Sequence, residues 1–100
     1  MLPDDIRTRF LAHLRFELGL SPNTCEAYLS DVDKLLSYME GERLSIEGVD
    51  YAHLQHFIAT LADLGIGPTS ISRIISGIRS FGRYLLLEGY TESDPTALLE

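Results

Sequence analysis

The segment from Pro68 to Glu88 constrains the fold most, because it carries two unlike faces at helical spacing. At about 100° per residue, its apolar side falls on one line of a helix, formed by Ile71, Ile74, Ile75, Ile78, Phe81, Gly82 and Leu85. The opposite side carries arginines among small polar residues, namely Thr69, Ser72, Arg73, Ser76, Arg79, Ser80 and Arg83. No acid occurs between Asp63 and Glu88. The segment therefore predicts one long helix that buries one face and exposes a basic one.

Three earlier segments repeat the helical apolar spacing, and we expect helices over residues 4–18, 22–41 and 51–64. Ser21 and Asp50 are residue types that cap helix N-termini. Glycines at positions 19, 41 and 65 are natural C-terminal stops for the three segments. No alternating strand pattern occurs anywhere in the sequence.

These patterns predict an all-α fold, a compact bundle of four helices arranged as two helix hairpins. Asp94 followed by Pro95 has the pattern of an N-cap and a first helical residue, so we expect the start of a fifth helix there. Gly77 and Gly82 lie inside the 68–88 helix, and each lowers its stability relative to alanine. Their presence therefore indicates that something packs closely at these positions. Gly82 lies on the core side and predicts close packing of another helix. Gly77 lies near Arg73 and Ser80 in projection, so there is room for the helix backbone to approach a ligand closely.

Length and composition favour a single helical domain that acts in the cytoplasm. The chain has 100 residues, of which 45% are hydrophobic, an ordinary value for a globular core. Its single cysteine, Cys25, excludes an internal disulfide and fits a reducing compartment, and we expect it to be buried as a small apolar residue. The sequence shows neither an apolar run long enough to span a bilayer nor a signal peptide, so we expect no membrane partner.

The formal net charge of −7 argues against a generic nucleic-acid binder, because such domains are usually basic overall. Guanidinium groups set between small hydroxyl residues nevertheless suit phosphate oxygens and guanine edges. A nucleic-acid role therefore requires that the positive charge be local to the 68–88 helix. The alternative is that these arginines form a solvated face or pair with acids on neighbouring helices.

The sequence contains no recognisable catalytic or metal-binding motif. It has no glycine-rich phosphate loop, no Cys/His zinc spacing and no nucleophile elbow. His53 and His56 stand three residues apart, but no cysteine or carboxylate completes a ligand set with them. We therefore expect no catalytic residues, no metal and no cofactor in this chain, which is not expected to be an enzyme by itself.

An ordered set of motifs resembles the N-terminal core-binding, SAM-like domain of tyrosine recombinases of the Xer and phage-integrase type. The family shows a GLSxNT turn followed by Tyr and Asp in the second helix, then an arginine-containing fourth helix, then EG and DP. Here these motifs stand as Gly19 to Thr24, Tyr28, Asp31, Ser70 to Arg73, Ser76, Arg79 to Phe81, Tyr84, Leu85, Glu88, Gly89, Asp94 and Pro95. The resemblance covers about Phe10 to Pro95.

The resemblance implies a helical bundle that forms half of a C-shaped clamp on duplex DNA. Its second and fourth helices would face the major groove and flanking phosphates of a recombination half-site. Residues 1–93 would form the core-binding domain, and residues 94–100 would begin the linker or helix that leads to a catalytic domain. That following domain holds the nucleophilic tyrosine of the family, so none of the five tyrosines here is assigned to catalysis. The implied partners are double-stranded DNA and neighbouring recombinase subunits, with a monomeric isolated domain.

The resemblance also marks individual DNA-contact candidates on the second and fourth helices. The matching positions are Asn23, Thr24, Thr69, Ser70, Arg73, Ser76 and Arg79. Lys34, on the outward side of the second helix, and Arg83, which continues the arginine stripe in projection, complete the candidate set. Many relatives carry arginines just after the tyrosine of the second helix, where this chain has Leu29 and Ser30. That departure and the acidity of the chain predict weaker DNA binding by the isolated domain.

A second function is compatible with the same sequence. The acidic surface and the off-stripe Phe16 fit a helical module that binds another protein. Specific binding that survives high salt, without DNA binding at low salt, would distinguish this alternative from a DNA-binding module.

Overall fold

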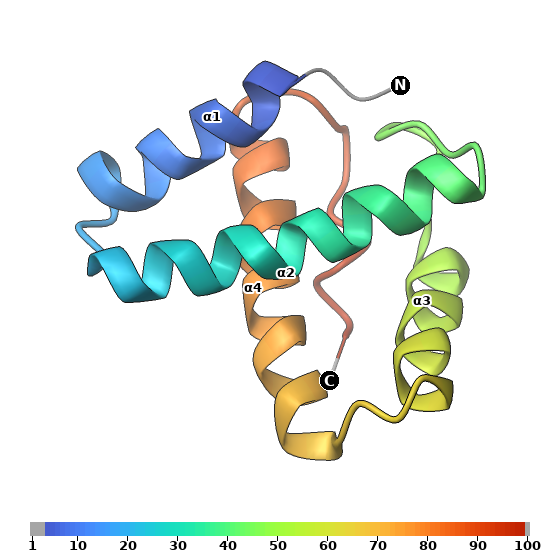
Figure 1. Ribbon diagram of the computed structural model, residues 1–100. Coiled ribbons are helices and arrows are strands. Elements are labelled where there is room, and N and C mark those ends of the chain that lie inside the picture. Colours follow the sequence, from blue (N-terminus) through green and yellow to red (C-terminus); the bar gives the residue numbers. More distant parts are fainter. Residues whose placement is uncertain (1–3, 100) are drawn as a thin grey trace.

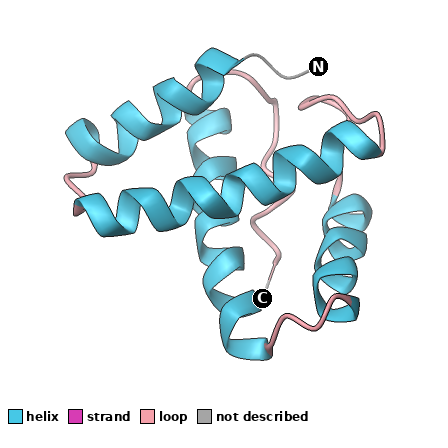
Figure 2. Cartoon of the chain, in the orientation of Figure 1, coloured by secondary structure: helices cyan, strands magenta, loops and turns pink. Residues whose placement is uncertain are grey.

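Helices form over the segments that the apolar spacing predicted (Figure 1). The computed structural model describes residues 4–99, and it contains α1 (Asp4–Ala12), η1 (His13–Glu17), α2 (Pro22–Gly41), α3 (Tyr51–Asp63) and α4 (Pro68–Leu87). No strand occurs within this range, as the cartoon in Figure 2 shows. The all-α prediction is therefore confirmed. Residues 1–3 and 100, which we assigned to the ends of the domain and of the fifth helix, lie outside the described range.

The helices form two antiparallel hairpins that cross each other (Figure 1). One hairpin joins α1 and η1 to α2, and the other joins α3 to α4 through a short turn. The long helix α2 passes across the middle of α4, and this crossing is the most extensive helix contact in the described chain. Arg7 of α1 donates two hydrogen bonds to the carboxylate of Asp33 on α2, at 2.7 and 2.9 Å.

An aromatic cluster joins α1 to α4 in the centre of the core. Phe10 is fully buried and meets Phe81 edge to face, with ring centroids 5.1 Å apart. Tyr84 packs against both Phe10 and the buried His13 ring. The expectation that Cys25 is buried is confirmed. Fully burying an aromatic ring of this kind contributes about 1.5–3 kcal/mol of transfer free energy, so this cluster is a main anchor of the bundle.

Two of the predicted helix starts have the expected caps. The Ser21 hydroxyl accepts a hydrogen bond from the backbone N–H of Thr24 at 3.3 Å, and Pro22 occupies the first turn. Asp50 accepts from the backbone N–H of His53 at 2.9 Å, while Nδ1 of His53 accepts from the backbone N–H of Asp50 at 3.1 Å. This reciprocal capping box satisfies two amide donors at the start of α3.

The helix ends follow the sequence less closely. Gly19 and Gly65 take positive φ angles of 64° and 91°, as C-terminal stops do. The prediction that α2 closes at Gly41 is confirmed, although Gly41 is itself the last helical residue and the left-handed conformation falls on Arg43, with φ of 57°. The helix expected over residues 4–18 also changes character, since residues 13–17 form a wider π-helical turn.

The predicted fifth helix does not form in the described residues. Asp94 accepts from the backbone N–H of Thr96 at 2.9 Å, as a cap would, but turns follow instead of a helix. Thr96 and Leu99 are buried against the bundle. A Cβ added to Gly82 would lie 2.2 Å from Oγ1 of Thr96, so the glycine admits this returning segment rather than another helix.

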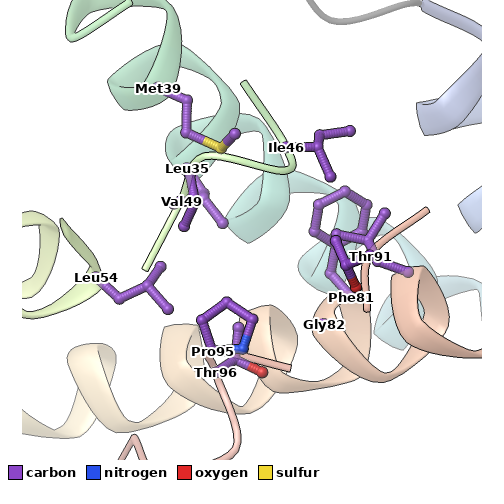
Figure 3. Close-up of a pocket in the computed structure, with 11 residues that line it drawn as sticks. Leu35, Met39, Ile46, Val49, Leu54, Phe81, Gly82, Thr91, Pro95 and Thr96 are labelled. Atoms are coloured by element: carbon purple, nitrogen blue, oxygen red, sulfur yellow. The ribbon is translucent and has the colours of Figure 1, made fainter. Parts of the chain in front are cut away.

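Residues 94–99, which fold back onto α4, close a small cavity of about 30 Å³. Figure 3 shows Pro95 and Thr96 beside Gly82, opposite apolar side chains from α2 and α3 that include Leu35 and Leu54. Thr96 and Leu99 therefore pack with the buried residues of the described chain, while Leu98 stays exposed.

Candidate nucleic-acid interface

The polar face of α4 is accessible over most of its length. Its exposed members are Thr69, Ser70, Ser72, Arg73, Ser76, Arg79 and Arg83. Ser80, which projection placed among them, is buried at 4% exposure. It lies on the edge of this face that turns toward the contact with α2, about 60° from Gly77 at 100° per residue. The prediction for Ser80 is therefore wrong, while every DNA-contact candidate on α4 reaches the surface.

The arginines of α4 fan out around its exposed side. At 100° per residue, Arg73 and Arg79 point about 120° apart, and Arg83 lies between these two directions. Among residues 4–99, no carboxylate forms an ion pair with Arg79 or Arg83, so both guanidiniums are available to an external anion. The alternative of pairing with neighbouring acids therefore does not apply to these two side chains.

Arg73 does pair with an acid from a neighbouring helix. Its Nη1 donates to Oδ2 of Asp31 on α2 at 2.9 Å. The Asp31 side chain is 0% exposed and the Arg73 side chain is 49% exposed. Although Asp31 is a charged residue, it is buried because α4 covers this part of α2. For Arg73, the alternative of an ion pair between helices is correct.

Gly77 makes room for the buried carboxylate of Asp31. A Cβ added to Gly77 would lie 2.7 Å from Oδ2 and 3.0 Å from Cβ of Asp31. Contacts this short do not occur between native side chains, so the crossing of α2 and α4 depends on a residue without a side chain here. The close approach that we expected at Gly77 is therefore made by Asp31 and not by a ligand.

The Asp31 carboxylate is only partly compensated. Burial raises its pKa, while the charges of Arg73 and Lys34 and the hydrogen bond from Arg73 oppose the rise. Its Oδ1 has no hydrogen-bond partner within the described chain. The crossing therefore holds one buried acid between two cations, with Lys34 one turn along α2.

The candidates on α2 lie along one side of that helix. Lys34 is half-buried, and its Nζ donates to the Ser30 hydroxyl at 3.2 Å. Asn23 is exposed, and the Thr24 hydroxyl is bound to Ser21 at 3.0 Å in the capping turn. Figure 1 places the N-terminal turn of α2 at one end of the molecule, away from the crossing. Only Lys34 therefore joins Arg73 at the crossing.

The two histidines considered for metal binding have other contacts. His53 belongs to the capping box of α3. The ring of His56 is hydrogen-bonded to the Tyr38 hydroxyl and lies 3.8 Å from a carboxylate oxygen of Glu42. Within residues 4–99, no group of three His, Cys, Asp or Glu side chains is placed to hold a metal ion. None of the described helices is long and apolar enough to cross a membrane.

The buried partner of Arg73 is the residue that sequence reasoning missed. The sequence feature that came closest to revealing Asp31 was the pair formed by Arg73 and Gly77, which lie four residues apart on one face of α4. An interior helical glycine beside an arginine indicates that something approaches there. The sequence alone did not show that the approaching group is an acid 42 residues away.

Known proteins show the same sequence pattern. Residues 8–89 match the family described as the N-terminal SAM-like domain of phage integrase. The chain is 39% identical over 98 residues to a tyrosine recombinase XerD of Staphylococcus saprophyticus, and this covers 97% of the chain and 33% of that relative. It is 39% identical over 87 residues to a tyrosine recombinase XerC of Pseudomonas syringae, covering 86% of the chain and 29% of the relative. The chain thus spans about a third of the length of these relatives.

Proposed function

The chain belongs to the family of phage integrase N-terminal SAM-like domains, and from this premise we propose that it is the DNA-gripping module of a site-specific tyrosine recombinase. In this proposal α2 and α4 hold the duplex of a recombination half-site. The contacts are made by Asn23, Thr24, Lys34, Thr69, Ser70, Arg73, Ser76, Arg79 and Arg83. Strand cleavage and rejoining belong to a catalytic domain that follows the helical domain.

The observation that carries the proposal is the exposed basic face of α4. Arg79 and Arg83 are exposed, and no acid within residues 4–99 pairs with them. Exposed serines at positions 72 and 76 flank Arg73 on the same helix, and serine hydroxyls and guanidiniums are both groups that bind phosphate oxygens. The N–H groups in the first turn of α4, at Thr69 and Ser70, suit a further phosphate oxygen. Relatives named tyrosine recombinases support the same function.

The direct test is binding of a mixed-sequence DNA duplex to the chain that carries Arg79→Gln and Arg83→Gln together. Each phosphate contact adds close to one unit to the slope of log K against log salt. We therefore expect the double variant to bind about ten- to a hundredfold more weakly at low salt, with a slope lower by about two. Fluorescence anisotropy at several salt concentrations measures both quantities.

A matched control comes from outside α2 and α4. Arg15 is exposed on η1, and its guanidinium lies over the Phe16 ring. Arg15→Gln removes one positive charge, as each of the other changes does, so its effect measures the loss of charge alone. Equal weakening by Arg15→Gln and by either single α4 variant would refute the assignment of the α4 face.

The proposal extends to the setting in which the module works. We propose that residues 94–100 lead into the catalytic domain, and that the full recombinase acts in the cytoplasm beside neighbouring subunits on the same DNA. The isolated domain is expected to be monomeric, and sedimentation velocity tests this. Phe16, which is 77% exposed, is one of several large apolar side chains that a contact with a neighbouring subunit would bury.

A further inference from the structure

The crossing of α2 and α4 contains a buried acid that touches a residue of the proposed DNA face. We propose that Asp31 is a positioning residue, which holds the Arg73 guanidinium at the α2–α4 crossing so that its free N–H groups meet a DNA phosphate. This inference rests on the proposed function, because it assigns a role within the same DNA face. Asp31 itself is fully buried and therefore makes no contact with DNA.

The geometry of the pair leaves most of the guanidinium free. Only Nη1 of Arg73 is hydrogen-bonded to Oδ2 of Asp31, at 2.9 Å. A guanidinium has five N–H donors in a rigid plane, and about half of the Arg73 side chain remains exposed. One edge of the plane is therefore fixed by a buried group while the other donors face solvent. Holding a flexible side chain in its bound position reduces the ordering cost when a ligand binds.

The surroundings of Asp31 indicate that the pair is held in place. The Asp31 side chain is 0% exposed, and its Oδ2 lies 2.7 Å from where a Cβ of residue 77 would stand, so the carboxylate is closely packed on this side. Lys34, one turn from Asp31 on α2, brings a second cation to the same place. A phosphate at the crossing would meet Arg73 and Lys34 together, with the carboxylate buried beneath them.

Simple electrostatics predicts the opposite effect, and this makes the inference testable. Removing a negative charge near a phosphate-binding surface should strengthen DNA binding. If Asp31 positions Arg73, replacing the carboxylate with a neutral isostere should weaken DNA binding instead. A charge-assisted hydrogen bond is about twice as strong as a neutral one, so Asp31→Asn loosens the guanidinium without changing the shape of the site.

The experiment is a double-mutant cycle in duplex binding at low salt. The four proteins are the wild type, Asp31→Asn, Arg73→Gln and the combination of both. We expect Asp31→Asn to weaken binding about two- to tenfold when Arg73 is present, which is the coupling typical of contacting residues. The same change should not weaken binding in the Arg73→Gln background. Arg79→Gln is the matched control, and its effect should be the same with Asp31 or Asn at position 31.

A side-chain measurement accompanies the cycle and does not depend on affinity. The heteronuclear NOE of the Arg73 Nε–H group in the free protein should exceed that of Arg79 and should fall to the same level in Asp31→Asn. Thermal unfolding by circular dichroism establishes that each variant is folded.

Two results would overturn the inference. The first is unchanged or stronger DNA binding by Asp31→Asn in the wild-type background. The second is equal weakening by Asp31→Asn with and without Arg73. Failure of the proposed function is a separate result, in which changes at Arg79 and Arg83 also leave DNA binding unaltered.

Discussion

Removal of the Arg73 side chain is expected to destabilise the fold by about 2–4 kcal/mol at pH 7. The change Arg73→Ala deletes the guanidinium that lies 2.9 Å from Oδ2 of Asp31, a side chain with 0% exposure. Removing one partner of a buried pair costs about 3–5 kcal/mol, because the other charge is left without compensation. Because Arg73 is half-exposed and solvent already screens the pair, the expected cost is lowered by about 1 kcal/mol from this range.

Protonation of Asp31 sets an upper limit on that cost and makes it depend on pH. The ordinary pKa of the group is 3.8, and each unit between this value and the solution pH is worth about 1.36 kcal/mol. The limit is thus about 4 kcal/mol at pH 7 and under about 2 kcal/mol at pH 5. Burial raises the pKa of Asp31 in the folded state, and loss of Arg73 raises it further. The folded state then binds the proton more readily than the unfolded state, so this contribution to stability rises as pH falls toward 3.8.

Urea denaturation followed by circular dichroism at pH 7, 6 and 5 measures this cost and its pH dependence. The control Arg79→Ala removes an exposed guanidinium and should stay within about 0.5 kcal/mol of the wild type. Combining Arg73→Ala with Asp31→Asn removes the titrating group, so the pH-dependent part of the loss should disappear. A cost under about 0.5 kcal/mol at pH 7, or an equal cost at pH 5 and pH 7, would refute the reasoning.

Two further substitutions test the backbone and packing arguments. Arg43→Gly should stabilise the protein by about 0.5–1 kcal/mol, because a left-handed residue with a side chain carries strain that glycine lacks; an unchanged or lower urea midpoint would contradict this. Gly77→Ala should destabilise it by about 1 kcal/mol or more, because overpacking against Asp31 outweighs the better helix propensity of alanine. The matched control is Gly41→Ala, because Gly41 is a helical glycine with nothing within 4 Å of an added Cβ. This change should raise the melting temperature. A rise in melting temperature for Gly77→Ala would show that the crossing is not tightly packed.

Most of the fold could be predicted from the sequence, because local patterns and tertiary packing agree. The apolar spacing of α4 places Ile74, Ile78 and Phe81 in the core, where each is 0–1% exposed. The caps at Ser21 and Asp50 act within three residues of their own positions, so the sequence reveals them directly. The ordered family motifs predicted membership of the recombinase family, and residues 8–89 match the model of its N-terminal SAM-like domain.

The errors arose where distant segments decide the outcome. Asp94 has a true capping contact, but the chain beyond it packs into the space left by Gly82 instead of continuing as a helix. Asp31 has the pattern of a surface residue on its own helix, and only the register of the α2–α4 crossing buries it beside Arg73. Neither register nor crossing position follows from periodicity within a single helix. The DNA contacts themselves stay predictions, since they depend on a partner.

The acidity of the whole chain is compatible with a basic DNA face because charges act over a limited distance in salt. The Debye length is about 8 Å at physiological ionic strength, whereas the shortest dimension of the described chain is 23 Å. A phosphate bound at Arg79 and Arg83 would therefore interact mainly with these guanidiniums, and acids much more than about 8 Å away would be largely screened. Near 0.01 M salt the Debye length grows to about 30 Å, so those acids would repel the duplex as well. As the salt concentration is lowered, the DNA affinity of this chain should accordingly stop rising. The affinity of a uniformly basic domain would continue to rise over the same range.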